Sequence, residues 1–586
     1  MGRTRCRWPV PYRSPCRWDE PAVSPVSRSR LLLLGLDGAT FDLITPWVAE
    51  GRLPTLVRLL REGAAGPMRS VPNRNSAAAW SSIVTGMNPG KHGIYWFVEY
   101  RDDYSYVFIN ASFREGAPLW RLLGEAGRPA LVLNVPMTYP AEPLDGVLIA
   151  GLDGPGAHDP RFAYPPGIVA EVEAALGAPY IVEVGMPGLV KAGRYDEALA
   201  EAHRAIDQRA AVARHLMRTR PWDLCMLVFR ETDPVQHFFW KFMAPDGFRV
   251  DPAAVARYGG AIREVYEHID AALGTLVAEA GPHDHVMVIS DHGAGPDSGK
   301  ARSLQRWLAA LGLLRFRADG RAGWRGRALR ALFAGVHALD RRLPVATKRR
   351  LAHALPGLRQ RTKVLMSYAH IDWQGTRAYS DGKRPDIWIN LRGRQPAGQV
   401  APGAEYDALC EFIRRQFTAA RGLPDGRPVV RAVYLRDEVY HGPHVVRSPD
   451  LIVEWERGAA PEAVLFPDGT VVRMREGGLD PMEQLVCGGH EPEGILILRG
   501  PAVAPGARVE GATVMDVAPT ALYLLGEAVP EAMDGVVRAE ALRAEVTAAH
   551  PPRTRRAVAA AAARSGYDRA DEAAIRDRLR GLGYVD

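Results

Sequence analysis

The chain has 586 residues, of which 47% are hydrophobic and 24% are charged, the balance of an ordinary globular protein. No apolar run approaches the roughly 20 residues that cross a bilayer, which argues against an integral membrane protein. The net charge of +7 is concentrated in residues 1–30 and 315–363, and the remainder is acidic. Without a basic folded face, we expect no specific nucleic-acid binding. The five cysteines are scattered without a CxxC pair, which disfavours a structural zinc cage or a disulfide framework.

Short apolar runs alternate with helical patterns along the chain, which predicts an α/β protein. Their near-continuous apolar character is typical of parallel strands buried on both faces. The fold class we expect is an α/β/α sandwich with a mostly parallel central sheet and helical cap insertions. The predicted strands are LLLLGL (31–36), ALVLNV (130–135), LCMLVF (224–229), HVMVIS (285–290), IWINL (387–391) and LIVEW (451–455).

Residues 31–545 are predicted to form the main domain, with two insertions at about 152–220 and 315–363. Residues 1–30 lack the apolar core of a secretory signal and are expected to be a disordered basic tail, so a cytoplasmic location is expected. Residues 546–586 are expected to be a C-terminal helical tail. The basic insertion contains a predicted amphipathic helix with three interpretations: a solvated helix packed on the domain, a lid over an anionic substrate, or a peripheral membrane contact.

Acidic and histidine side chains follow several predicted strands directly, in GLDG, FRETDPVQH and SDHG, and another histidine lies in the glycine-rich turn GGHEPEG. Functional groups of open α/β sheets gather at the carboxyl ends of the strands. Histidine and aspartate without cysteine suit zinc, and such sites also admit manganese. Each residue alone has a structural alternative, such as a helix cap or a surface turn. The candidate ligands are Asp37, Asp233, His237, Asp291, His292 and His490.

Ser76 precedes the helix-forming run AAAWSSIV, so it is expected at a helix N-terminus. A serine there is commonly an N-cap. The backbone N–H groups at such a terminus also favour a phosphate or sulfate. Beside a metal ion, the hydroxyl can lose its proton and attack phosphorus. The residues alone leave both interpretations open.

Five motifs in this order resemble the alkaline phosphatase superfamily, and within it the type I phosphodiesterase/nucleotide pyrophosphatase branch: GLDG, NSAAAWSSIVTGMNPGKHGI, ETDPVQHFFW, SDHG and GGHEPEGILI. The resemblance extends from residue 31 to about 530. It implies metal-dependent hydrolysis of phosphate esters by attack of Ser76 on phosphorus, through a phosphoseryl intermediate. It also implies two divalent metals, expected to be zinc with manganese as the alternative. One would be held by Asp233, His237 and His490, and the other by Asp37, Asp291 and His292 with Ser76 beside it.

The sequence departs from the pattern of this branch at two positions. Nucleotide pyrophosphatases usually carry threonine as the nucleophile, with an asparagine three residues later that helps bind the phosphoryl oxygens. This chain has Ser76 and Ala79 there. Lys91 and His92 belong to a shared motif and are interpreted as mainly structural, with His92 a minor site candidate. The side chains considered as replacements for the missing amide are Asn73, Arg74, Asn75 and Lys91.

The expected substrate is a phosphate ester, either a small molecule or a lipid head group. Two alternatives to hydrolysis are a phosphotransferase or phosphomutase on the same scaffold, and a membrane-surface binding protein that uses the 315–363 segment. A sulfatase is disfavoured because no cysteine stands near residue 76 in the required C-x-P-x-R context. The sequence does not choose between diester and monoester, and it assigns no oligomeric state.

Overall fold

The structure is a computed structural model that describes residues 29–317, 370–458, 460–474, 484–556 and 564–581. The basic tail and the amphipathic helix predicted within 315–363 lie almost entirely outside these residues. Within the described part, no helix combines the length and the apolar character that crossing a bilayer requires.

A nine-stranded sheet forms the centre of the molecule. Its central strands β9, β1, β8, β5 and β6 are parallel, while β19 runs antiparallel to both of its neighbours and β7 runs antiparallel to β6. The predicted α/β class with a mostly parallel sheet is therefore confirmed. In sheet order the strands are β20 (Ala512–Thr513), β2 (Ala64–Arg69), β19 (Glu493–Arg499), β9 (His285–Ile289), β1 (Leu31–Leu36), β8 (Leu224–Phe229), β5 (Ala130–Val135), β6 (Gly146–Ala150) and β7 (Ala163–Tyr164).

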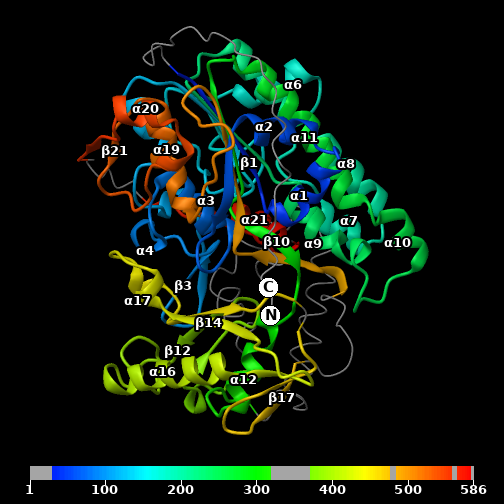
Figure 1. The fold of residues 1–586 in the computed structure, drawn as a ribbon. Helices are drawn as coiled ribbons and strands as arrows, with labels where there is room; N and C mark the ends of the chain where they lie inside the picture. Colours follow the sequence, from blue (N-terminus) through cyan, green and yellow to red (C-terminus); the bar gives the residue numbers. More distant parts are fainter. Residues whose placement is uncertain (1–28, 318–369, 459, 475–483, 557–563, 582–586) are drawn as a thin grey trace.

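The four apolar runs predicted for the first half of the chain are β1, β5, β8 and β9, and every residue in them is buried. Full burial explains why these strands show no alternation of polar and apolar residues. Helices cover both faces of the sheet (Figure 1). On one side lie α3 (Ser76–Thr85) and α19 (Val517–Leu524), and on the other α8 (Tyr195–Thr219) and α11 (Ala261–Glu279).

The last two predicted strands belong to a different sheet. β12 (Asp386–Ile389) and β15 (Leu451–Trp455) pair antiparallel within a four-stranded sheet of order β11-β12-β15-β14, so the parallel pairing expected for them is wrong. A run of buried apolar residues indicates cover on both faces, but it does not fix the direction of the neighbouring strand. The outer strands are β11 (Ala378–Tyr379) and β14 (Val430–Leu435).

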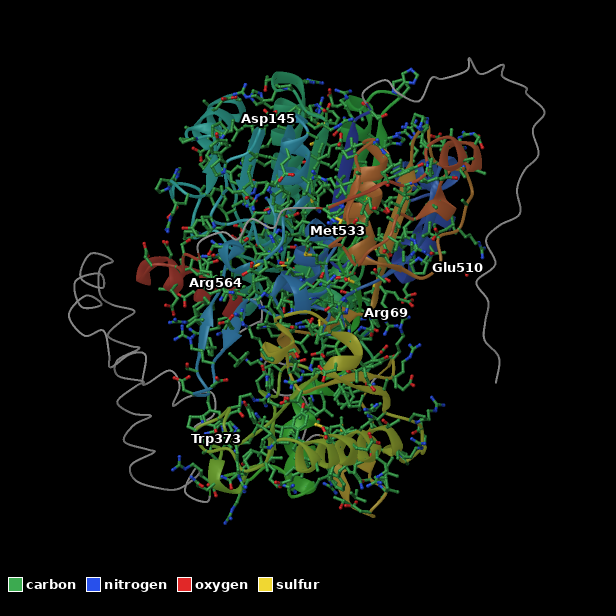
Figure 2. The ribbon with its side chains drawn as sticks, turned by 90° about the vertical axis from the view of Figure 1, so that its left-hand side faces the viewer. Arg69, Asp145, Trp373, Glu510, Met533 and Arg564 are labelled. Atoms are coloured by element: carbon green, nitrogen blue, oxygen red, sulfur yellow. The ribbon has the colours of Figure 1, made fainter. Side chains whose placement is uncertain are left out.

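This smaller sheet has a hydrophobic core of its own, which it shares with α12 (Leu304–Ala310) and α16 (Ala404–Ala419). It forms a second body below the large sheet in Figure 1. Arg69, at the end of β2, lies between the two bodies in Figure 2, and its Nη2 donates to Glu454 Oε2 on β15 over 2.9 Å. Side chains of both bodies can therefore line one site.

The 152–220 segment contains α6 (Ile168–Leu176), α7 (Met186–Lys191) and α8, and α8 buries Ala202, Ala205 and Ile206. The C-terminal residues include α20 (Ala544–Ala549) and α21 (Arg569–Gly581). The chain just before α21 lies on the main domain, because the ring of Tyr567 stacks on that of Tyr139 at a centroid distance of 5.6 Å.

Further helices connect these strands or cover their ends. They are α1 (Phe41–Ala49), α2 (Pro54–Glu62), α4 (Pro89–His92), α5 (Leu119–Glu125), α9 (Thr232–Met243), α10 (Pro252–Tyr258) and α17 (Arg436–Val439). The remaining strands form small pairs and one three-stranded sheet. They are β3 (Val98–Tyr100), β4 (Tyr106–Phe108), β10 (Gly293–Pro296), β13 (Arg421–Leu423), β16 (Ala463–Leu465), β17 (Val471–Arg473), β18 (Gly488–Glu491), β21 (Val529–Pro530) and β22 (Thr554–Arg555).

Candidate metal centre

Three neighbouring strands of the central sheet, β8, β1 and β9, end at the same level. The register pairs Leu36 with Phe229 and Gly35 with Ile289. Asp37 follows β1 directly, and the SDHG turn follows β9. The carboxyl ends of parallel strands therefore bring these polar residues together, as the sequence pattern predicted.

Asp233 and His237 lie on α9, which begins two residues after β8. They are four residues apart on one face of the helix, and His237 Nε2 lies 3.1 Å from Asp233 Oδ1. Every residue of α9 up to Phe242 is buried. An ordinary solvated acid and histidine, the alternative to a ligand pair, does not fit this burial.

His490 reaches the cluster through strand pairing. β18 pairs antiparallel with β10, so that His490 lies opposite Ala294, just after the SDHG turn. Its ring stacks on the ring of His292 with a centroid distance of 3.7 Å. His490 Nε2 lies 3.3 Å from Asp233 Oδ1 and 3.0 Å from His237 Nε2.

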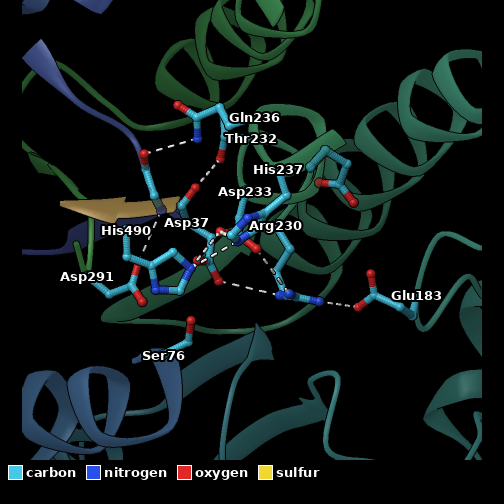
Figure 3. A network of polar contacts seen from close by, with 12 residues as sticks. Asp37, Ser76, Glu183, Arg230, Thr232, Asp233, Gln236, His237, Asp291 and His490 are labelled. Atoms are coloured by element: carbon cyan, nitrogen blue, oxygen red, sulfur yellow. Dashed lines mark hydrogen bonds and ion pairs between the residues drawn. The ribbon is translucent and has the colours of Figure 1, made fainter. Parts of the chain in front are cut away.

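The structure therefore brings all six predicted ligand side chains into one cluster, and Figure 3 labels all of them except His292. Its donor atoms form two candidate metal-binding groups: one of Asp37, Asp291 and His292, and one of Asp233, His292 and His490. The first group matches the ligand set that the resemblance implied. The second contains His292 where His237 was expected, and His237 lies beside it at the distances given above. His292 is thus common to both groups.

Hydrogen bonds fix which nitrogen of each histidine faces the cluster. The Nδ1 atoms of His237, His490 and His292 lie 2.7, 2.6 and 3.0 Å from the backbone oxygens of Gly488, Arg74 and Gly293. A carbonyl oxygen only accepts, so each Nδ1 carries a proton and donates it. In the neutral ring, each Nε2 then presents its lone pair to the cluster. The Nε2 atoms of His237 and His490 lie 3.0 Å apart, so a proton or a metal ion has to occupy at least one of their lone pairs.

The carboxylates point to the same conclusion. The buried atoms Asp37 Oδ1, Asp233 Oδ2 and Asp291 Oδ2 accept no hydrogen bond from the described residues. Burial, reinforced by Asp233, raises the pKa of Asp37 to about 6. Burial together with Asp37 and Asp233 raises the pKa of Asp291 well above its usual range. Arg230 supplies one positive charge against these three carboxylates. Divalent cations held by aspartate and histidine would supply the rest.

A further set of side chains, not identified from the sequence, orients these ligands (Figure 3). Arg230 Nε donates to Asp37 Oδ2 over 3.4 Å, and its Nη2 lies 3.8 Å from Asp233 Oδ2. The other end of the guanidinium donates to Glu183, which belongs to the 152–220 segment. Thr232 Oγ1 donates to the backbone oxygen of Asp37 over 2.5 Å. The charged FRE run at the end of a buried strand was a signal for Arg230, whereas nothing in the sequence connects Glu183 to it.

The first motif ends in a glycine, Gly38, whose backbone angle and close contacts leave little room for a side chain. Its φ of +70° is in the left-handed region, and an added Cβ would lie 3.3 Å from both Gln236 Nε2 and His292 Cε1. Its N–H donates to Asp291 Oδ1 over 3.2 Å. A side chain at this position would therefore strain the backbone and press on a candidate ligand.

Ser76 is the first residue of α3, but it is not the cap. The cap is Asn75, whose side chain accepts from the N–H of Ala78 over 3.1 Å. The Ser76 hydroxyl is fully buried, faces the cluster in Figure 3, and lies 3.4 Å from His292 Nε2. The N-cap interpretation of Ser76 is therefore wrong, and its hydroxyl is adjacent to both candidate groups.

Two of the side chains considered as replacements for the missing amide lie in structural contacts. Lys91 Nζ forms an ion pair with Asp534 Oδ1 at 2.5 Å. Asn75 is occupied by the helix cap and by donation to the backbone oxygen of Tyr95 over 2.6 Å. His92, the minor site candidate, lies 2.9 Å from Ser82 Oγ, and burial lowers its pKa to about 3. These contacts support the structural interpretation of Lys91 and His92.

The other two, Asn73 and Arg74, line a cavity of about 290 Å³ that begins at His237 and His490. Both bodies of the molecule contribute to its wall. The central domain supplies Asn73, Arg74 and Trp96, and the smaller body supplies Lys383, Arg384 and Trp455. The arrangement thus combines a buried nucleophile candidate, two candidate metal groups and an adjoining cavity lined by cationic, acidic and aromatic side chains.

Comparison with known proteins agrees with this geometry. The type I phosphodiesterase/nucleotide pyrophosphatase family matches residues 31–464. The chain belongs to this family. It is a family of phosphoester hydrolases within the alkaline phosphatase superfamily, so the resemblance seen in the motifs is confirmed. No curated protein matches the chain.

Solved structures share the fold of this type I phosphodiesterase family member. Phosphonoacetate hydrolase from Sinorhizobium meliloti 1021, solved with phosphonoacetate, is 15% identical with a TM-score of 0.50, and the match covers 85% of this chain and 95% of that one. Murine ectonucleotide pyrophosphatase/phosphodiesterase 5, an inactive variant with AMP, is 14% identical with a TM-score of 0.42, covering 85% and 96%. At 15% identity the likeness to phosphonoacetate hydrolase concerns the fold alone.

Proposed function

We propose that this protein hydrolyses phosphate esters through a phosphoseryl intermediate on Ser76, with two divalent metals held by the Asp/His cluster. The observation that carries the proposal is the buried Ser76 hydroxyl, 3.4 Å from His292 Nε2, a nitrogen that belongs to both candidate metal groups. Three imidazole and three carboxylate side chains without cysteine favour zinc, with manganese as the alternative.

When bound, two such metals would act as Lewis acids that lower the pKa of the nucleophilic hydroxyl and stabilise the departing oxygen. In the first step Ser76 Oγ forms a bond to phosphorus, the bond from phosphorus to the leaving oxygen breaks, and the serine proton passes to solvent. The departing oxygen takes a proton from water. In the second step water attacks the phosphoserine, which restores the serine hydroxyl and releases the phosphorylated product.

The side chains described above fit these steps. Because Asn75 caps α3, the Ser76 hydroxyl is not needed for the N-terminal N–H groups. The Nδ1 contacts of the three histidines hold their rings with Nε2 toward the cluster. Arg230 contacts a carboxylate of each candidate group, which supports their relative positions.

The test compares Ser76→Ala with Ser81→Ala in hydrolysis of bis-p-nitrophenyl phosphate. Ser81 lies on the same buried helix, but its hydroxyl donates to the backbone oxygen of Ala77 and does not contact the cluster. We expect Ser76→Ala to lose at least about a thousandfold in kcat, and Ser81→Ala to lose less than about tenfold. Equal activity of Ser76→Ala and the wild type would rule out the nucleophile assignment.

Product analysis separates hydrolysis from the transferase alternative. In water containing an added alcohol, a hydrolase releases mainly the water product, whereas a phosphotransferase passes the phosphoryl group to the alcohol. Mass spectrometry of acid-quenched protein would detect phosphate on the peptide that contains Ser76. Transfer to the alcohol in preference to water would replace hydrolysis with the phosphotransferase function.

A further inference from the structure

The cavity next to the cluster contains an arginine with no acidic partner. Arg74 lies two residues before Ser76, and its Nη1 donates to the backbone oxygen of His490 over 3.3 Å. Among the described residues, no carboxylate lies within ion-pair distance of its guanidinium. Arg74 is half-buried in the cavity wall, which limits its contact with water. A poorly solvated cation without an ion pair is suited to bind an anion.

The acids nearest to Arg74 are engaged by other groups. Glu491 Oε2 lies 3.5 Å from Arg457, and Glu454 accepts from Arg69 over 2.9 Å. Glu454 also accepts from the hydroxyl of Tyr434 over 2.7 Å. Both carboxylates still attract the guanidinium. Among the described residues, however, neither lies within ion-pair distance of it.

The backbone at Arg74 is also unusual. Its φ of +50° is in the left-handed region, which is unfavourable for a residue with a Cβ. Two hydrogen bonds hold this conformation. The N–H of Arg74 donates to the backbone oxygen of Val71 over 2.9 Å, and the backbone oxygen of Arg74 accepts from His490 Nδ1 over 2.6 Å. The backbone of Arg74 thus orients a candidate metal ligand, while its side chain lines the cavity.

The smaller body contributes two further cations to the cavity wall. Lys383 and Arg384 lie in the loop between β11 and β12 of the smaller body. Arg384 is buried, its Nε donates to Asp381 over 2.6 Å, and its guanidinium lies 4.8 Å above the ring of Trp96. This packing fixes the loop that presents the exposed Lys383 at the cavity. The cavity lining therefore holds Arg74, Arg302, Lys383 and Arg384 together with the acids Asp297, Glu456 and Glu491.

We propose that Arg74 is a specificity-determining residue that binds an anionic group carried by the leaving group of the substrate. The inference rests on the proposed function, because it places the leaving group of the hydrolysed ester in the cavity beyond His237 and His490. The ligand chemistry is a phosphate or a carboxylate attached to the departing oxygen. Arg74 therefore makes this chain favour substrates with a charged leaving group.

A matched pair of substrates tests this inference. Phenyl 4-nitrophenyl phosphate and phenyl 3-carboxy-4-nitrophenyl phosphate share one phosphoryl centre and differ by one carboxylate on the leaving phenol. A third substrate, P1-phenyl pyrophosphate, has phosphate as its leaving group and distinguishes phosphate recognition from carboxylate recognition. The variants are Arg74→Gln and Arg74→Lys. The control is Arg499→Gln, which removes the same charge at the end of β19 far from His490.

We expect wild type to prefer at least one charged leaving group by about tenfold or more in kcat/KM over the uncharged one. Arg74→Gln should lose this preference, so that its kcat/KM falls at least about tenfold more for the charged leaving group than for the uncharged one. Arg74→Lys should retain part of the preference, and Arg499→Gln all of it. Metal content per chain, measured by mass spectrometry, should be the same in all variants.

Three results would overturn the inference. If the wild type hydrolysed the charged and uncharged substrates with equal kcat/KM, the proposed function would stand but Arg74 would have no role in specificity. If Arg74→Gln lost metal and hydrolysed all three substrates more slowly by the same factor, Arg74 would only support His490. Wild type with bound metal that hydrolyses none of the three would overturn the proposed function and the inference together.

Discussion

The protonation of each histidine in the cluster decides whether its Nε2 can bind a metal ion. His237 is the clearest example, because Gly488 O accepts from its Nδ1 and leaves Nε2 facing His490 and Asp233. Without a metal, Asp233 outweighs the opposing effect of burial and raises the pKa of His237 to about 9. A proton and a metal ion therefore compete for the same lone pair. The side chains that attract the proton also form the metal site.

The first prediction concerns metal content. Asp233→Ala combined with His237→Ala removes two donors from one side of the cluster and leaves Asp37, Asp291 and His292 in place. We expect about two zinc or manganese ions per wild-type chain and about one in the double variant, measured by mass spectrometry. The structural reason is that the remaining three donors form a complete candidate group by themselves.

The matched control is a second aspartate–histidine pair outside the cluster. His268 Nε2 lies 2.8 Å from Asp207 Oδ1, with Asp207 on α8 and His268 on α11. Asp207→Ala combined with His268→Ala should leave the metal content at about two. An equal loss of metal in both double variants would mean that destabilisation, and not ligand removal, causes the loss.

At the scale of elements, the cluster depends on β18 lying against α9. A Cβ added at Gly488 would lie 2.2 Å from the backbone oxygen of Gln236, so the strand and the helix touch through their backbones. The N–H of Cys487 donates to the oxygen of His237 over 2.7 Å at the same contact. This close approach sets the distance between His490 and His237.

The second prediction follows from that contact. Gly488→Ala should push β18 away from α9 and lower the unfolding free energy by about 1–3 kcal/mol, the usual cost of overpacking. It should also weaken metal retention during dialysis, because His490 moves with its strand. Gly489→Ala is the control, since its added Cβ would have no atom closer than 3.3 Å. If Gly489→Ala lost as much metal as Gly488→Ala, the backbone contact would not be the cause.

The same elements show how far the sequence could predict the structure. The strands β1, β8 and β9 and the polar residues at their ends were predictable, because buried parallel strands have a distinctive apolar run. The antiparallel pairing of β12 and β15 was not, since burial does not encode strand direction. Neither was the capping of α3 by Asn75, because Asn75 and Ser76 are both good caps. Glu183 reaches Arg230 only through the tertiary fold.

For the molecule as a whole, the cluster joins segments that are far apart in the chain. It connects the ends of β1 and β9, the first turn of α9, the strand β18 and, through Glu183, the 152–220 segment. Burial, reinforced by the neighbouring carboxylates, raises the pKa of Asp37 and Asp291, so both resist carrying a negative charge without a cation beside them. Metal binding should therefore stabilise the folded chain as well as activate it.

The third prediction is that chelation lowers the thermal unfolding midpoint and that added zinc restores it. A ligand that binds only the folded state stabilises it by about 4 kcal/mol at a thousandfold excess over its Kd. Scanning calorimetry on chelated and zinc-loaded wild type would measure the shift. The Asp233→Ala/His237→Ala variant should gain less from zinc, because one candidate group remains. The Asp207→Ala/His268→Ala control should gain as much as wild type. Equal gains in wild type and both variants would place the stabilising zinc outside the cluster, because nonspecific binding does not depend on Asp233 and His237.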